Sequence, residues 1–288
     1  MKKHLSILVF TALLTTLNLF AQTGSVKDNL FLTSKILNME RKFAIYLPPD
    51  YSTSERSYPV LYLLHGAGDD QTGWVQFGEV LNIADKAIHS NEATAMIIVM
   101  PEANTGQRGY FNSIDGNFRY EDFFFQELIP YIEANYRVRS EKRYRAIAGL
   151  SMGGGGTIVY ALHHPELFAA ACPLSAGNGL QDRENSFKMY KWQKPELSDE
   201  ELESYFKNNN GFELVNSLPE DKVKEVRWYI DCGDDDPRWE NNAKLHGLMN
   251  QKGIPNEFRV RDGGHTWTYW RSALPEVLMF VSQSFRQY

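Results

Sequence analysis

Short apolar runs rich in β-branched and aromatic residues alternate along the chain with longer segments of helical period. Because strands that alternate with helices form sheets buried on both faces, this pattern predicts an α/β fold with a mainly parallel sheet and helices on both sides. Strands are expected at 42–47, 59–64, 95–100, 144–149, 169–174, 227–232 and 257–261. Helices are expected around 78–89, 121–135, 153–163, 239–251 and 273–285.

One stretch, 177–224, breaks this alternation because it is polar and charged throughout. Within it, Ser198 and Glu201 have the spacing of a capping box, in which a serine and a glutamate satisfy backbone groups at a helix start. We interpret 177–224 as an insertion over one end of the sheet, within a single domain that covers 22–288.

The first residues have the pattern of a secretory signal peptide. Lys2 and Lys3 precede an apolar run that ends at Ala21, and small residues of this kind favour cleavage. The alternative, a membrane anchor, is less favoured because Thr11, Thr15, Thr16 and Asn18 interrupt the run. We therefore expect residues 1–21 to be removed, the mature chain to be secreted or periplasmic, and no span of the membrane to remain.

Charge and cysteine content narrow the possible partners. Removal of Lys2 and Lys3 takes the formal net charge from −6 to −8, and no basic block follows, so binding to nucleic acid is not expected. The chain has only two cysteines, Cys172 and Cys232, and each lies in an apolar run. Buried thiols are favoured over a disulfide, and two cysteines are too few for a structural zinc site.

The stretch "AIAGLSMGGGG", residues 146–156, requires an explanation for its glycines. A phosphate-binding loop would need Lys-Ser or Lys-Thr after the last glycine, and a dinucleotide site would need the spacing G-x-G-x-x-G. Neither is present. A flexible linker would have polar flanks, whereas this run lies between an apolar strand and a helical segment that ends before Pro165.

The pattern G-x-S-x-G does fit, with Ser151 between Gly149 and Gly153 where a strand turns sharply into a helix. Glycine is needed on either side because side chains there would collide with the neighbouring strand and helix. This predicts Ser151 as a nucleophile at the carboxyl end of the sheet. The further glycines, Gly154 to Gly156, are expected to let the helix start pack closely.

A nucleophilic serine needs a base and an acid that orients the base. His265 follows the last predicted strand, beside two glycines, and comes after the serine in the chain order expected of an α/β-hydrolase. Apart from His65, the other histidines of the mature chain lie on or beside helices. They are expected to lie at the surface or to have hydrogen-bond partners, and they are His89, His163, His164 and His246.

Acidic residues cluster in "YIDCGDDDPRW", between the serine and the histidine. Asp231 lies within a strand, while Asp234, Asp235 and Asp236 follow it, and spacing alone does not choose among these three. A calcium loop is the alternative interpretation, but no bidentate glutamate follows at the required distance. No metal is therefore assigned.

Backbone donors for an oxyanion are expected from two places. One is the His-Gly loop after the strand 59–64, and the other is the N–H of Met152, directly after the nucleophile. His65 could be mistaken for a second base. Its position at a strand end beside Gly66 favours a structural role in fixing the loop.

Several stretches together resemble the esterase D-like α/β-hydrolases, and among them the feruloyl and acetyl-xylan esterases. They are "AIYLPPDY" (44–51), "YPVLYLLHGAG" (58–68), "YEDFFFQELIPYIEANYRV" (120–138), "AIAGLSMGGGG" (146–156), "CGDDD" (232–236) and "GGHTWTYWR" (263–271). The resemblance implies Ser151 as nucleophile, His265 as base and Asp236 as acid. It also implies the backbone amides of Ala67 and Met152 as the oxyanion hole.

The resulting hypothesis is two-step ester hydrolysis through an acyl-enzyme, without cofactor or metal, with 177–224 as a candidate lid. The resemblance implies a plant polysaccharide substrate carrying feruloyl or acetyl esters, such as xylan. Trp74 and Trp267 are candidates for substrate binding, whereas Trp270 is expected in the core. The alternatives are esterases for a siderophore or simple acyl ester, an acyltransferase, and an inactive carbohydrate-binding protein.

Overall fold

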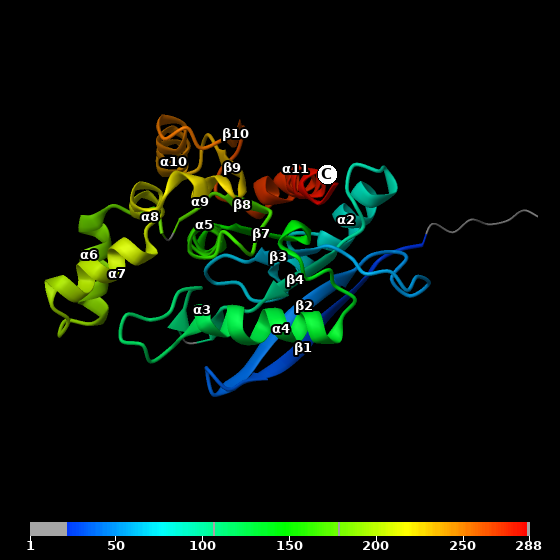
Figure 1. Cartoon of the computed structure of the whole chain (residues 1–288), viewed down its shortest axis with the longest axis horizontal. Helices are drawn as coiled ribbons and strands as arrows, with labels where there is room; N and C mark the ends of the chain where they lie inside the picture. Colours follow the sequence, from blue (N-terminus) through cyan, green and yellow to red (C-terminus); the bar gives the residue numbers. More distant parts are fainter. Residues whose placement is uncertain (1–21, 106, 178, 287–288) are drawn as a thin grey trace, which may run out of the picture.

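An eight-stranded sheet forms the centre of the molecule (Figure 1), with the strand order β1-β2-β4-β3-β7-β8-β9-β10. The computed structural model describes residues 22–105, 107–177 and 179–286, so the predicted signal segment 1–21 lies outside the described residues. The strands are β1 (Ser25–Ser34), β2 (Met39–Leu47), β3 (Val60–Leu64), β4 (Ile97–Pro101), β7 (Arg145–Leu150), β8 (Ala170–Leu174), β9 (Arg227–Gly233) and β10 (Asn256–Arg261). A separate ribbon pairs β5 (Asn104–Thr105) with β6 (Gln107–Arg108).

Strand pairing confirms the prediction of a mainly parallel sheet. β2 is antiparallel to β1 and β4, whereas every pairing from β4 to β10 is parallel. Each of the seven predicted strands overlaps an observed one. Because parallel strands end at the same edge, the loops after β3, β7, β9 and β10 come together there.

β1 was not predicted. Most of its side chains are partly or fully exposed, and Lys27 and Asp28 interrupt its apolar pattern. It pairs with β2 alone at the edge of the sheet. Edge strands need little apolar sequence, because one side of the strand and part of its faces remain in solvent.

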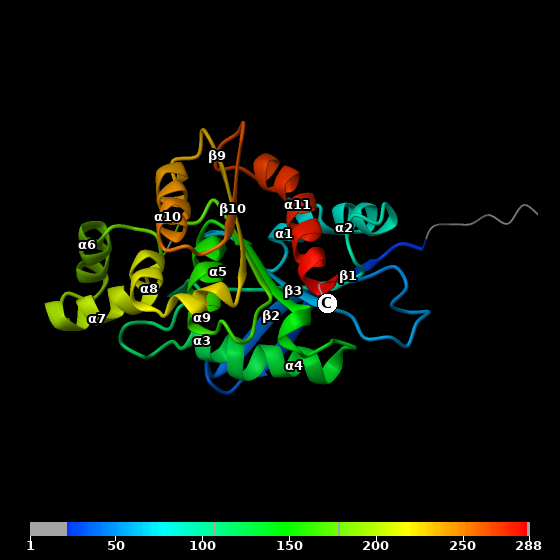
Figure 2. The ribbon, with the colours of Figure 1, turned by 45° about the horizontal axis from the view of Figure 1, so that its top comes forward.

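Helices cover both faces, and each face has its own apolar core (Figures 1 and 2). One face carries α1 (Gly73–Gln76), α2 (Val80–His89) and α11 (Trp267–Arg286). The other carries α3 (Tyr120–Phe123), a π-turn η1 (Phe124–Leu128), α4 (Ile129–Asn135), α5 (Met152–His163) and α10 (Trp239–Gln251). A 3₁₀ turn, η2 (Lys142–Tyr144), precedes β7. α11 begins six residues before the predicted start at 273.

Four helices fill the predicted insertion between β8 and β9: α6 (Arg183–Gln193), α7 (Asp199–Asn209), α8 (Gly211–Ser217) and α9 (Glu220–Lys224). The expected capping box at Ser198 and Glu201 is present at the start of α7. Leu214 and Val215 of α8 and Val223 of α9 join the core beside α5. α6 and α7 project to one side of the molecule, at the left of Figures 1 and 2.

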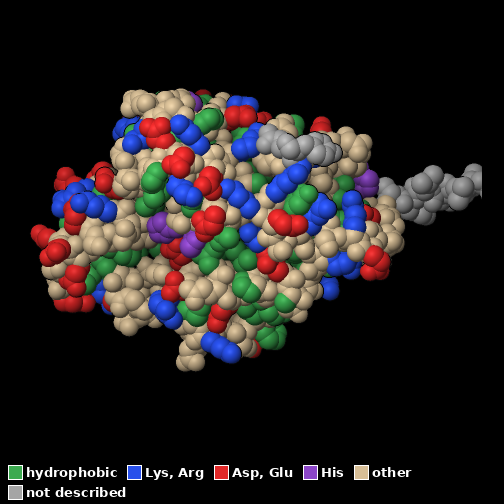
Figure 3. Space-filling model, viewed as in Figure 1, with side chains coloured by type: hydrophobic (Ala, Val, Ile, Leu, Met, Phe, Trp, Pro, Cys, Tyr) green, Lys and Arg blue, Asp and Glu red, His purple; other side chains and the backbone are tan. Residues whose placement is uncertain are grey.

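Cys172 on β8 and Cys232 on β9 are buried free thiols, as predicted. Among the described helices, none has the length and apolar character needed to cross a membrane. On the face drawn in Figure 3, basic and acidic side chains are interspersed. That face therefore offers no continuous basic stripe of the kind that follows a phosphate backbone.

Candidate active site

Ser151 lies at the turn between β7 and α5 in a strained backbone conformation, with φ 54° and ψ −111°. A positive φ is costly for a residue with a side chain and persists only where surrounding contacts hold it. Three hydrogen bonds do so here. The Ser151 N–H donates to the Leu174 carbonyl at 2.9 Å, and its carbonyl accepts from Gly155 and Gly177.

The glycines around Ser151 have the predicted steric role. A Cβ on Gly149 would lie 2.6 Å from the Gly153 carbonyl oxygen, and one on Gly153 would lie 2.7 Å from the carbonyl oxygen of His65. A Cβ on Gly154 would lie 2.7 Å from the Leu174 carbonyl oxygen. Contacts this close exclude a side chain, so the glycine run allows helix α5 to start directly against the strand ends.

His265 and Asp236 meet Ser151 at the edge of the sheet. The His265 Nε2 lies 2.9 Å from the Ser151 Oγ, and its Nδ1 lies 2.8 Å from the Asp236 Oδ2. His265 comes from the loop between β10 and α11, and Asp236 from the loop after β9. A neutral imidazole that donates from Nδ1 to the carboxylate leaves Nε2 free to accept the serine proton.

The Asp236 carboxyl is buried but stays easily ionised. Burial by itself would raise its pKa, but hydrogen bonds from His265, from the Arg238 N–H and from the Ser175 hydroxyl outweigh it and hold the pKa below its ordinary value. The Arg238 N–H donates to Oδ1 at 2.8 Å. A charged carboxylate at this position stabilises the imidazolium that forms when His265 takes a proton.

The other aspartates in this region have different surroundings. Asp231 is fully buried in β9, where it pairs with Arg261 at 2.6 Å and accepts from the Tyr229 and Tyr269 hydroxyls. Asp234 and Asp235 are exposed, and the Asp234 Oδ1 accepts the Gly263 N–H. Of the three loop aspartates that the sequence left open, the structure brings Asp236 to His265.

Asp234, Asp235 and Asp262 bring carboxylate oxygens within 4.8 Å of one another. All three side chains are exposed to solvent, where water solvates a carboxylate and no bound cation is needed to stabilise its charge. None of these three carboxylates belongs to the hydrogen-bonded chain from Ser151 through His265 to Asp236.

His65 fixes the loop after β3. Its Nδ1 lies 2.8 Å from the Gly66 carbonyl, and its Nε2 accepts the Ala103 N–H at 2.9 Å. A ring that accepts at Nε2 must donate from Nδ1, so the side chain is neutral. Burial lowers the pKa of His65 to about 4, which keeps it neutral at physiological pH. Its structural role is as predicted.

Of the candidate oxyanion donors, Ala67 lies in the loop after β3 and Met152 directly follows Ser151. Met152 is the first residue of α5, and the N–H groups of a first helical turn have no partner within the helix. The positive end of the helix dipole lies at the same point. Both residues line the same cavity, so negative charge developing there would meet the start of α5.

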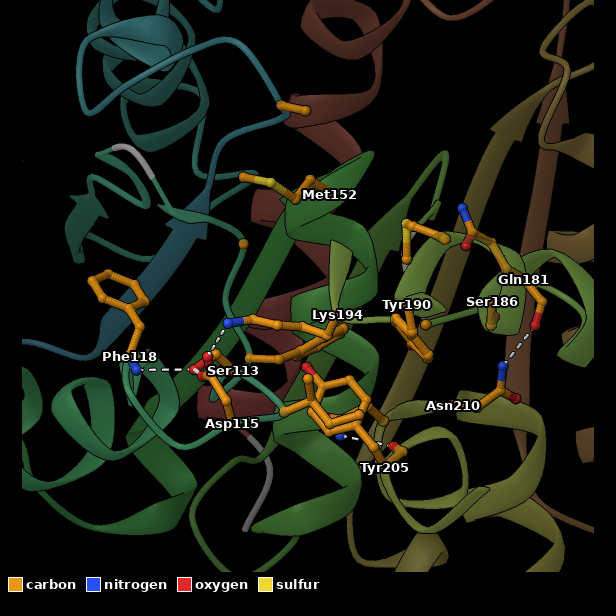
Figure 4. A pocket seen from close by; sticks show the side chains of 17 residues that line it. Ser113, Asp115, Phe118, Met152, Gln181, Ser186, Tyr190, Lys194, Tyr205 and Asn210 are labelled. Carbon is orange, nitrogen blue, oxygen red and sulfur yellow. Dashed lines mark hydrogen bonds and ion pairs between the residues drawn. The ribbon is translucent and has the colours of Figure 1, made fainter. Parts of the chain in front are cut away.

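That cavity has a volume of about 370 Å³ and extends from Ala67 and Met152 toward the insertion (Figure 4). The loop before α3 forms one wall and helices α6 and α7 form the other. Its apolar and aromatic lining consists of Phe111, Ile114, Phe118, Met189, Tyr190 and Tyr205. The Lys194 amine points to the Asp115 carboxylate, 2.5 Å away, and both residues line the cavity (Figure 4).

The two tryptophans expected to bind substrate differ. Trp74 is fully buried in the core and donates its indole N–H to the Leu64 carbonyl at 3.0 Å, so the expectation that it contacts substrate is corrected. Trp267 is only half-buried and packs edge-on against Trp74 and Trp270 and beside the exposed Phe77. Trp270 is buried in the core, as expected.

Sequence reasoning missed the insertion residues that line the cavity, such as Tyr190, Lys194 and Tyr205. They lie within the polar insertion, where no motif marks them. The helix-start signal at Ser198 identified one helix there but not which of its faces lines a cavity. The closely spaced aromatic residues at 187, 190, 205 and 206 were the available signal.

With this geometry established, comparison with known proteins identifies the family. A family model described as "Putative esterase" matches residues 34–281, so the chain belongs to this esterase family. Its fold is the α/β-hydrolase fold. A solved structure of a ferulic acid esterase is 37% identical, covers 91% of this chain and 99% of its own, and superposes with a TM-score of 0.81.

Two curated relatives match about half of the chain. An esterase of Mycobacterium tuberculosis is 40% identical over 141 residues, which are 48% of this chain and 29% of the relative. An endo-1,4-beta-xylanase/feruloyl esterase of Xylanibacter ruminicola is 36% identical over 155 residues, which are 51% of this chain and 21% of the relative. The matched segments thus span less than a third of these relatives.

Proposed function

We propose that this protein hydrolyses carboxylic esters with Ser151 as nucleophile, His265 as general base and Asp236 as the acid that orients it. The observation that carries the proposal is the unbroken hydrogen-bonded chain from the Ser151 Oγ through both nitrogens of His265 to the Asp236 carboxylate. Membership of the esterase family supports it.

Each step follows from these positions. His265 takes the Ser151 proton at Nε2 while the serine oxygen attacks the ester carbonyl carbon. The N–H groups of Ala67 and Met152 stabilise the oxyanion. His265 then returns the proton to the leaving alcohol, which departs and leaves the acyl group on Ser151. In the second half, His265 deprotonates a water that attacks the acyl carbonyl carbon, and then returns that proton to the Ser151 oxygen as its bond to the acyl group breaks and the acid leaves. No cofactor takes part.

We further propose that the acyl group is a feruloyl or related aromatic acid carried on a plant polysaccharide such as xylan. The aromatic lining of the cavity beside Ala67 and Met152 supports an aromatic ring there, because offset and edge-on ring contacts add to apolar burial. The relatives whose names contain feruloyl and ferulic acid esterase support the same substrate class. Trp267, which is half-buried beside His265 in the chain, stays a candidate for substrate contact.

Two further parts of the proposal rest on the sequence. A signal peptide at 1–21 would direct the enzyme to the periplasm or outside the cell, where polysaccharide is found, and would then be removed. The insertion 177–224 would act as a lid that forms one wall of the cavity, within one domain covering 22–288.

The test compares release of ferulate and of acetate from arabinoxylan and from acetylated xylan by the purified chain. The proposal predicts ferulate release that is lost in Ser151→Ala. Release of acetate alone would agree with the proposed mechanism but would identify the acyl group as acetyl instead of feruloyl. Ferulate release by Ser151→Ala at the wild-type rate would contradict the mechanism.

A further inference from the structure

Ser175, directly after β8, has an unusual backbone and a buried hydroxyl. Its φ is 46°, in the left-handed region that favours glycine, and the residue is fully buried. Its N–H donates to the Asp231 carbonyl at 2.7 Å, which fixes it between β8 and β9. Glycine would adopt this backbone without strain. The presence of serine at this position therefore indicates that its hydroxyl has a function.

The hydroxyl of Ser175 accepts a hydrogen bond from the indole N–H of Trp270 at 3.0 Å. The same indole packs edge-on against the His265 ring, with 4.9 Å between ring centroids and an interplanar angle of 87°. Trp270 is 6% exposed, so solvent does not compete for either contact. One side chain therefore touches both the proposed base and the residue beside the proposed acid.

Because Ser175 accepts from Trp270, its one hydroxyl proton is free to donate, and its two neighbouring acceptors are the Asp236 carboxylate and the Cys232 sulfur. Burial raises the pKa of Cys232 to about 12, so it is a neutral thiol and a weak acceptor. A hydrogen bond to an ionised carboxylate is stronger. The proton is therefore directed to Asp236, where the other charged or titratable neighbours are His265 and Arg238.

We propose that Ser175 and Trp270 are positioning residues for the reaction: the Trp270 indole orients the Ser175 hydroxyl toward Asp236 and at the same time holds the His265 ring. This inference rests on the proposed roles of Asp236 and His265. Neither Ser175 nor Trp270 touches the reacting atoms. The two residues fix the direction in which the base faces Ser151, and small errors in that direction are costly to catalysis.

The test uses Ser175→Gly, Trp270→Phe and the double variant in the full chain. Ser175→Gly removes the hydroxyl and relieves backbone strain, so the protein stays folded. We expect kcat/KM at its plateau to fall about tenfold in each single variant with KM nearly unchanged. The acid limb of the pH profile should move to higher pH, because Asp236 loses a donor and its pair with His265 binds a proton more readily.

The double variant should lose little more than either single variant, because both substitutions remove the same hydrogen bond and phenylalanine keeps an aromatic ring beside His265. Ser282→Ala is the matched control, since Ser282 is also buried and its hydroxyl also has two partners, which here are the backbone Thr94 N–H and the Leu278 carbonyl. It should lower thermal stability and leave the pH profile unchanged.

An unchanged plateau and acid limb in Ser175→Gly would overturn the inference, as would a loss that simply follows thermal stability in all variants. The proposed function fails separately, if Ser151→Ala or His265→Ala retains wild-type turnover. Loss of activity in those two variants with a normal Ser175→Gly variant would therefore reject only the positioning role.

Discussion

Ser151, His265 and Asp236 stand at the ends of core strands, whereas the facing wall of the cavity comes from the helical insertion between β8 and β9. Asp236 and Ser151 are 3% and 7% exposed, and neighbouring hydrogen bonds fix them. The Lys194–Asp115 pair joins the insertion to the loop before α3, and its side chains are 38% and 21% exposed.

This difference separates two requirements of an esterase. Proton transfer needs atoms held to within a fraction of an ångström, which a sheet edge provides. Acyl recognition needs a shaped surface, which helices and loops can supply and vary. Changes at the strand ends should therefore abolish turnover for all esters, whereas changes in the insertion should alter which ester is preferred.

The largest effect is expected for Ser151→Ala. Removal of the proposed nucleophile should lower kcat by about 10⁴-fold or more for every ester, because the members of a catalytic triad act as a unit. Steady-state kinetics with a feruloyl and an acetyl ester measure it, with thermal stability as the control for folding. Substantial turnover of either ester would contradict the assignment.

Asp236→Asn should lower kcat by roughly 10³- to 10⁴-fold, because an amide does not hold the His265 tautomer that accepts the serine proton. The matched control is Asp235→Asn, one residue away and exposed, which should change kcat less than about twofold. Equal losses in the two variants would mean that the orienting acid is wrongly assigned.

His65 should make the loop beside the site sensitive to acid. Its pKa is about 4 in the folded protein and about 6.5 when unfolded, so the unfolded state alone binds this proton between those values. The free energy of unfolding should therefore fall as the pH drops from 6.5 to 4, by up to about 3 kcal/mol from this residue. Denaturant unfolding across this range measures the slope, which His65→Gln should reduce. An equal slope in the variant would refute the assignment.

Tyr190→Ala tests the other region. It removes a ring that lines the cavity and packs edge-on against Tyr205 with 5.2 Å between centroids. KM for a feruloyl ester should rise about tenfold, the loss of about 1.4 kcal/mol of ring contact, while an acetyl ester, which does not reach the ring, should be unaffected. Equal increases in KM for both esters would indicate that the Tyr190 ring supports folding and does not recognise the acyl group.

The smallest effect is expected for Lys194→Ala, which breaks the pair with Asp115. Because a solvent-exposed ion pair contributes little to stability, thermal stability should barely change and KM should change less than about threefold. The pair's salt dependence gives a second check, because screening should reduce the difference between wild type and variant. A tenfold or larger loss of turnover would contradict this expectation and show that the ion pair is needed for catalysis.

The sequence predicted the strand-end region well, because its constraints are local. The glycines at 149 and 153 must lie beside a strained serine, and the order of Ser151, Asp236 and His265 follows from the order of the strands. What spacing could not supply was the choice among Asp234, Asp235 and Asp236. That choice depends on which carboxylate the turn after β9 directs inward, a property of three-dimensional packing.

For the insertion, the sequence predicted its bounds and one helix start but not the residues that line the cavity. Its polar helices carry no motif, and the faces of α6 and α7 that line the cavity follow from how these helices pack. Trp74 and β1 show the same limit. A tryptophan after a glycine-rich loop suits a core or a surface equally well, and an edge strand needs too little apolar sequence to be recognised.

The central claim, that Ser151 is an activated nucleophile, is tested most directly by labelling the purified chain with a serine-reactive fluorophosphonate and mapping the modified residue by mass spectrometry. We predict one covalent adduct on Ser151, formed rapidly in the wild type and in Tyr190→Ala, slowly in Asp236→Asn, and not in Ser151→Ala. An adduct on another residue, or no adduct on a folded wild-type protein, would contradict it.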